Sequence, residues 1–114
     1  MKSIGYAGAV PRSYGQKRCP VARTLDIIGE RWTPLILRDL ILRGPRRYQD
    51  LLESLAGIAP NTLSARLKDL EDNGLVERKL YNERPPRLEY HLTGKGRSLA
   101  PVLRALRDWG QQNA

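Results

Sequence analysis

Two side chains in this sequence, Cys19 and His91, are of types that commonly do covalent or acid–base chemistry. They are the only cysteine and the only histidine among 114 residues, too few to hold a structural zinc ion without recruited carboxylates. Leu88, Tyr90 and Leu92 alternate onto one face of an expected strand, which leaves His91 on the wet face. The sequence therefore predicts no metal site and no cofactor.

A third segment, Thr93-Gly94-Lys95-Gly96, is superficially similar to a phosphate-binding loop. Such a loop needs glycine five residues before its Gly-Lys pair and serine or threonine after it. Those positions hold Glu89 and Gly96. We interpret the segment as a strand-to-helix turn, and the chain is predicted not to be an enzyme.

Hydrogen bonding to base edges and phosphates is a different chemistry, and residues 60–72 are suited to it. Pro60 fits a first helical position, and leucines at 63, 67 and 70 form a narrow apolar stripe. The residues predicted to face bases are small, polar or basic: Asn61, Thr62, Ser64, Ala65 and Arg66. Lys68 is predicted to contact phosphate. An ordinary amphipathic surface helix is the alternative interpretation.

The charge balance also favours a polyanionic partner. Twenty Lys and Arg against twelve Asp and Glu give a net charge of +8 and a pI near 10.2. A small basic domain commonly binds nucleic acid, although a basic surface that serves only solubility is the alternative. No apolar run approaches the ~20 residues of a membrane helix. The absence of an apolar leader predicts a cytoplasmic protein.

Several short elements must position these groups. Hydrophobic periodicity and helix-boundary residues predict helices over 20–28, 33–42, 48–55, 60–72 and 94–110, the second being central and buried. Thr33 is expected to cap that second helix. Two β-type runs, Leu75–Leu80 and Arg87–Leu92, predict a hairpin with a six-residue loop.

This order of elements predicts a mainly α fold with a small antiparallel hairpin, a winged helix-turn-helix (α+β). In this fold one helix enters the ~12 Å major groove of DNA. The hairpin, or wing, reaches the neighbouring backbone or minor groove. Besides Lys68, the side chains predicted to contact phosphates or the minor groove are Arg46, Arg47, Arg84 and Arg87.

The chain resembles the HxlR-type family of bacterial winged-helix transcriptional regulators. The matching segments are Cys19-Pro20-Val21, Leu25 to Thr33, Arg47 to Leu51, Gly57-Ile58, Leu63 to Glu71, Gly74 to Arg78, Tyr81, Pro85 to Thr93, Gly96 and Trp109. Together they cover residues 19 to about 110.

The resemblance implies a homodimer that binds inverted-repeat operator DNA, with half-sites about one helical turn apart. It also implies dimerisation through the first and last helices. The apolar stripe then assigned to the dimer interface is Leu99, Val102, Leu103, Leu106 and Trp109. Ala59 departs from the family, which often has a capping serine there, at a cost of roughly 1 kcal/mol.

In some family members the cysteine equivalent to Cys19 senses oxidants or electrophiles, and the resemblance carries that hypothesis here. Lys17, Arg18 and the helix start favour a reactive thiolate, and with one cysteine any disulfide must be intermolecular. A buried, structural cysteine at the helix start is the alternative. A small-molecule effector is a further hypothesis without assigned residues.

The expected organisation is a flexible basic arm over 1–18, a DNA-binding and dimerisation domain over 19–110, and a short tail over 111–114. Two other function classes are considered. An RNA-binding protein is disfavoured because aromatic residues make up only 6% and phenylalanine is absent. A protein-interaction module is disfavoured by the clustered basic residues.

Overall fold

The computed structural model describes residues 19–114, so the basic arm expected over 1–18 lies outside the described residues. The elements are α1 (Pro20–Ile28), α2 (Thr33–Arg43), α3 (Tyr48–Ser54), α4 (Pro60–Asp72), β1 (Val76–Glu83), β2 (Pro86–Leu92), α5 (Gly94–Arg97) and α6 (Ala100–Asn113). The predicted fold class is confirmed, and the predicted bounds of α1 and α4 agree with the structure.

The core gathers around α2, as its apolar circumference predicts. Ile36 and Leu37 of α2 are 0% exposed, and Leu40 is 2% exposed. The side chains packed around them come from α1, α3, α4, the start of β1 and the two connections that flank α4: Ile28, Leu51, Leu55, Ile58, Leu63, Leu67, Leu70, Leu75 and Val76. This single core fixes α4 and the base of the wing relative to each other.

The wing is longer than the sequence pattern indicated. β1 and β2 pair antiparallel from Val76↔Leu92 to Glu83↔Pro86, with a register shift between Leu80 and Asn82. The expected six-residue loop is therefore wrong: the strands continue pairing until only Arg84 and Pro85, joined by a cis peptide bond, connect them. A β-bulge at Tyr81 accommodates the extra residue, so residues 82 and 83 continue to pair with β2 although their composition is typical of a turn.

The last helix is interrupted, which corrects the expectation of one helix over 94–110. α5 ends at Arg97 and α6 begins at Ala100. Pro101 explains the break, because a proline inside a helix lacks the amide donor and clashes with the carbonyl four residues earlier. The expected tail over 111–114 is helical as far as Asn113.

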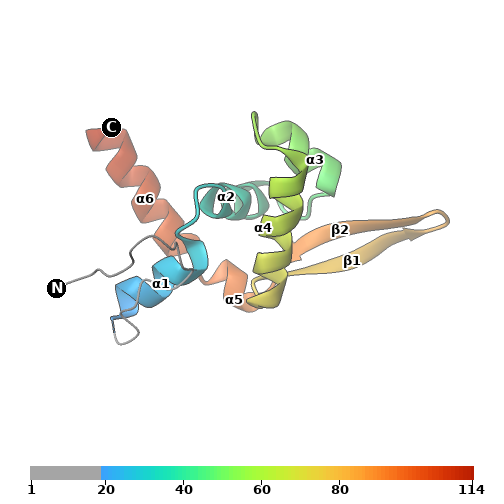
Figure 1. Cartoon of the computed structure of the whole chain (residues 1–114), viewed down its shortest axis with the longest axis horizontal. Helices are drawn as coiled ribbons and strands as arrows, with labels where there is room; N and C mark the ends of the chain where they lie inside the picture. The colour runs from blue at the N-terminus through green and yellow to red at the C-terminus, as the bar shows by residue number, and fades with distance from the viewer. Residues whose placement is uncertain (1–18) are drawn as a thin grey trace.

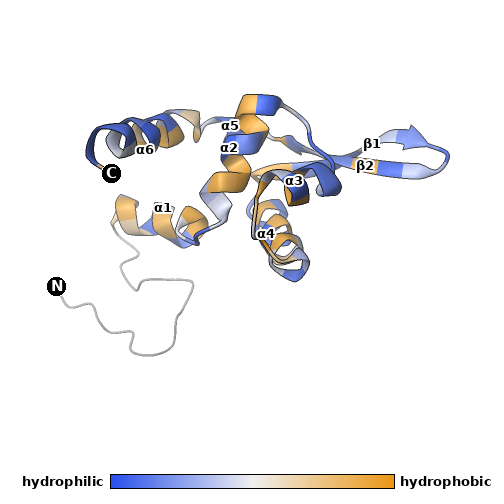
Figure 2. Cartoon of the chain, turned by 90° about the horizontal axis from the view of Figure 1, so that it is seen from above, coloured by the Kyte–Doolittle hydropathy of each residue, from blue (hydrophilic) through white to orange (hydrophobic). Residues whose placement is uncertain are grey.

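The two ends of the described chain differ in character. α1 and α6 lie at one end and the wing projects from the other, with α4 between them (Figure 1). Seen from above, apolar residues lie along α1 and α6, whereas the outer part of the wing is mostly hydrophilic (Figure 2). The fold therefore places a mostly hydrophilic wing at one end and two amphipathic helices at the other.

Candidate nucleic-acid interface

α4 presents one exposed polar face and buries the opposite one. Asn61, Ser64, Ala65 and Lys68 are exposed, at the spacing of one helix face. The leucines at 63, 67 and 70 are at most 1% exposed. Four of the six residues predicted on this helix therefore share a solvent-facing surface that a groove could receive. Thr62 and Arg66 are half-buried on its flank.

The beginning of α4 is held by its backbone and by α3. Ala59 is extended and makes no side-chain cap, in line with the sequence, and Pro60 opens the helix. The Tyr48 hydroxyl donates to the Pro60 carbonyl at 2.9 Å, and Ser64 Oγ donates to that hydroxyl at 3.4 Å. Because no side chain of the N-cap residue accepts from the first-turn amides of α4, this helix start favours an anion such as phosphate.

Arg66 is engaged on the inner flank of α4 instead of standing free on the outer face. Its guanidinium lies 3.1 Å from Asp69 Oδ2 and 3.6 Å from Glu30 Oε2, and the side chain is 22% exposed. Its Nε is buried without a hydrogen-bond partner. This arrangement suits an arginine that positions the helix better than one that reads a base.

Glu30 links this arginine to α2. Its Oε1 accepts hydrogen bonds from Trp32 N at 2.7 Å, Thr33 N at 3.0 Å and Thr33 Oγ1 at 3.2 Å. The expectation that Thr33 caps α2 is therefore wrong: Thr33 is buried and donates its hydroxyl, and Glu30 supplies the acceptor. Glu30 thus connects the N-terminus of α2 to Arg66 of α4.

The two arginines before α3 occupy different environments. Arg46 pairs with Tyr90 through both backbone hydrogen bonds, at 3.1 and 2.7 Å, so this stretch adds a bridge to the wing. The Arg46 side chain is half-buried and its Nε has no hydrogen-bond partner. Burial raises the pKa of Tyr90 beside it in the sheet.

Arg47 forms a bidentate pair with Asp50, with Nε–Oδ2 at 3.0 Å and NH2–Oδ1 at 2.6 Å. These hydrogen bonds lower the pKa of Asp50 to about 2, and Asp50 and Tyr81 raise the pKa of Arg47. The Arg47 side chain is still 51% exposed. It can therefore meet a phosphate while Asp50 fixes its direction.

The wing is joined to α4 by an ion pair and offers arginines near its tip. Arg78 Nε lies 2.9 Å from Glu71 Oε2, and this contact raises the pKa of Arg78. Arg84 and Arg87 are exposed and make no ion pair within residues 19–114. On α4 itself, Lys68 makes only an exposed pair with Asp72 at 3.3 Å. Arg84 and Arg87 are thus free to accept a new anionic partner, and Lys68 can do so by leaving its exposed pair with Asp72.

The two side chains singled out for covalent or acid–base chemistry lie at the start of α1 and near the end of β2. Cys19 is half-buried at the N-cap of α1, and its side chain makes no capping hydrogen bond. His91 is half-buried, with Nε2 3.0 Å from Glu89 Oε1, so the wet-face expectation is only partly met. In the described part of the chain no cluster of ligand side chains could hold a metal ion. No helix between residues 19 and 114 is long and apolar enough to cross a membrane.

The sequence interpretation missed Tyr48 and Glu30 as positioning residues. Spacing alone assigns the Tyr48 hydroxyl no partner on α4, whereas the fold brings it to Pro60 and Ser64. Glu30 carried one local signal, since it stands three residues before Thr33 at the start of α2. Its second partner, Arg66, is remote in sequence and becomes visible only in the fold.

Known proteins share this architecture. The family model described as "HxlR-like helix-turn-helix" matches residues 27–114. The transcriptional regulator sll1512 of Synechocystis sp. is 41% identical over 84% of this chain and 73% of its own length. The redox regulator HypR in its reduced form is 34% identical, with a TM-score of 0.77 over 83% of this chain and 93% of its own. The reduced regulator YodB of Bacillus subtilis is 34% identical, with a TM-score of 0.72 over 84% and 94%.

These matches agree with the arrangement of α4, the wing and the buried core. The chain belongs to the HxlR-like helix-turn-helix family, whose relatives here are named as transcriptional regulators.

Proposed function

We propose that the chain is a transcriptional regulator that binds double-stranded DNA sequence-specifically. The observation that carries this proposal is the exposed face of α4, which presents small hydrogen-bonding side chains and Lys68 beside a basic wing. A helix of this kind fits the major groove, where amide and hydroxyl groups distinguish base pairs. The family and the names of its relatives support the same conclusion.

Each side chain then has a distinct role. Asn61, Ser64 and Ala65 face base edges, with Thr62 at the flank of the helix. Lys68, Arg47, Arg84 and Arg87 contact phosphates, and the wing arginines are long enough to enter the minor groove. Arg66, held by Glu30 and Asp69, positions α4, and Arg46 supports the root of the wing.

Two variants separate base reading from phosphate binding. Asn61→Ala is expected to lower affinity for the preferred duplex by ~1–3 kcal/mol and to relax discrimination at one base pair. Arg84→Ala is expected to weaken preferred and scrambled duplexes alike and to reduce the slope of log K against log salt by about 1. Fluorescence anisotropy at several salt concentrations measures both.

The comparison has a built-in control, because the two variants are measured on the same two duplexes. If Asn61→Ala weakened both duplexes equally, α4 would not be reading bases. If Arg84→Ala left the salt slope unchanged, the wing would not be contacting phosphates.

We propose that the protein acts as a homodimer through α1 and α6. Val102, Leu106 and Trp109 of α6 are 37%, 54% and 65% exposed, and Val21 and Leu25 of α1 are 67% and 44% exposed. Leu99 and Leu103, the other two predicted interface residues, are partly buried against the core. This much exposed apolar surface at one end of the chain favours burial by a second copy.

Trp109→Asp is expected to convert the dimer into a monomer, because burying the new carboxylate at the interface is costly. Sedimentation equilibrium measures the mass. Leu80→Asp is the matched control, since Leu80 is 56% exposed, close to the 65% of Trp109, but lies on the wing. A wild-type monomer at micromolar concentration, or a Trp109→Asp protein that remains dimeric, would contradict the proposed interface.

We also propose that Cys19 makes the regulator responsive to oxidants. The relatives HypR and YodB have reduced structures alongside an oxidised and a diamide-treated one, respectively. Cys19 lies at the start of α1, inside the proposed dimer region, so an intermolecular disulfide or mixed disulfide there would disturb the pairing of subunits.

Diamide is expected to lower the DNA affinity of the wild type and to leave Cys19→Ser unaffected. Anisotropy before and after diamide, then after dithiothreitol, measures the change and its reversal. An equal response of wild type and Cys19→Ser would exclude a role for this thiol.

A further inference from the structure

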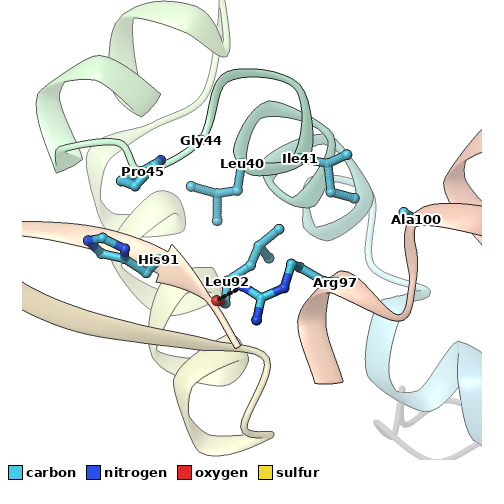
Figure 3. Close-up of a pocket in the computed structure, with 8 residues that line it drawn as sticks. All are labelled: Leu40, Ile41, Gly44, Pro45, His91, Leu92, Arg97 and Ala100. Carbon is cyan, nitrogen blue, oxygen red and sulfur yellow. Dashed lines mark hydrogen bonds between the residues drawn. The ribbon is translucent and has the colours of Figure 1, made fainter. Parts of the chain in front are cut away.

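A pocket lies between α2, the end of β2 and the beginning of α6, away from the exposed face of α4. Its cavity volume is about 430 Å³, within the ~300–1,000 Å³ typical of small-molecule sites. Figure 3 shows Leu40 and Ile41 on one side and Leu92 with Arg97 on the other, with Ala100 at one end. The walls are therefore mainly aliphatic and come from four elements, α2, β2, α5 and α6.

The pocket contains one cation without a carboxylate partner. Arg97 is exposed and donates from NH1 to the Leu92 carbonyl at 2.9 Å, a bond that holds its guanidinium at the pocket (Figure 3). Arg97 makes no ion pair within residues 19–114. The other basic side chain lining the pocket, His91, faces Glu89 at 3.0 Å. The remaining guanidinium N–H groups of Arg97 are thus available to an anion.

The combination of apolar walls and one fixed guanidinium defines the ligand. Small-molecule sites are mostly apolar with a few polar groups that fix orientation, and a guanidinium binds a carboxylate through two parallel hydrogen bonds. We propose that this pocket binds a small organic acid with an apolar body, whose carboxylate pairs with Arg97 and whose body packs on Leu40, Ile41 and Leu92.

The pocket lies where a bound ligand contacts both the wing and the last helix. His91 and Leu92 belong to the wing strand, Arg97 to α5 and Ala100 to α6. A ligand in the pocket therefore contacts both the base of the wing and the helix that carries the exposed apolar stripe. Resting on the function proposed above, this pocket is the effector site of the regulator.

The test measures binding without DNA, so failure of the proposed DNA-binding function leaves it unaffected. The full-length protein, labelled with ¹⁵N, is titrated with benzoate, naphthalene-2-carboxylate, 4-phenylbutyrate and octanoate. At least one of them is expected to shift the amide signals of Gly44, Leu92 and Arg97 at submillimolar concentration. Its uncharged carboxamide counterpart is expected to bind about tenfold more weakly or worse.

Two variants assign the contact. Arg97→Gln is expected to weaken binding about tenfold or more, because the amide keeps a donor for the Leu92 carbonyl but loses the charge. Ala100→Phe is expected to abolish binding by filling the cavity, with Arg97 intact. Arg104→Gln is the matched control, since Arg104 lies on α6 and lines only the neighbouring groove between α2 and α6, which shares Ile41 and Ala100 with the pocket.

Three results would overturn the proposal. One is that none of the four acids shifts the pocket amides at millimolar concentration. Another is that the wild type binds the carboxamide as tightly as the acid, or that Arg97→Gln binds the acid as tightly as the wild type does. The third is that the shifts fall on Leu35 and Leu106, which line the α2–α6 groove, and not on the pocket.

Discussion

Gly96→Ala is expected to destabilise the protein by about 3 kcal/mol or more, because the added methyl group would overlap a tightly packed backbone. A Cβ at Gly96 would meet the Leu75 carbonyl oxygen and lie 2.9 Å from Leu92 Cδ2. That carbonyl accepts the Thr93 amide at 3.0 Å, so it cannot move away cheaply. Urea denaturation of wild type and variant measures the difference.

Gly94→Ala is the matched control for this prediction. Gly94 lies two residues away in the same turn, and a Cβ there meets nothing within 4 Å. Its expected effect is within ~1 kcal/mol of the wild type. A Gly96→Ala protein as stable as Gly94→Ala would show that the packing of α5 against the α4–β1 connection is not tight.

The second large effect is expected from Glu30→Ala, which removes the acceptor for both backbone amides and the Thr33 hydroxyl at the start of α2. Loss of a helix cap costs about 0.5–2 kcal/mol, and the buried Thr33 hydroxyl loses its partner as well. We expect a total near 2 kcal/mol in the free energy of unfolding. Thermal and urea denaturation measure it.

Glu30→Gln separates the cap from the ion pair. The amide oxygen still accepts from Trp32 N and Thr33 N, but the attraction to Arg66 is lost. Glu30→Gln is therefore expected to lower the free energy of unfolding by less than half as much as Glu30→Ala. DNA affinity is expected to fall in Glu30→Gln and Arg66→Ala alike, and their effects should not add if Arg66 acts through Glu30. Additive losses would instead return Arg66 to direct contact with DNA.

Local signals were sufficient where an element is specified by its own residues. Pro60 and the leucine stripe at 63, 67 and 70 predict the start and the buried face of α4, and its exposed face follows from the same spacing. Thr93 likewise caps the turn it was expected to form, accepting from Gly96 N at 3.0 Å.

Prediction failed where a distant contact or a competing signal decided the structure. The apolar stripe over 99–109 indicated one helix, but Pro101 imposed a break. The Tyr81–Pro86 composition is typical of a loop, yet cross-strand pairing continued to Glu83↔Pro86. The contact of Arg66 with bases stays a prediction, and only the folded chain shows that Glu30 and Asp69 engage its guanidinium.

We propose that two copies of the chain bind DNA symmetrically, each through its α4 and its wing. Selection from a random-sequence duplex library with the reduced wild-type protein is the first measurement to make. We expect enrichment of an inverted repeat whose half-site centres lie about 10–10.5 base pairs apart, or a multiple of that spacing. We also expect affinity for the enriched duplex roughly a thousandfold or more above that for its scrambled counterpart. Recovery of no enriched sequence, with equal affinity for all duplexes, would contradict the proposal.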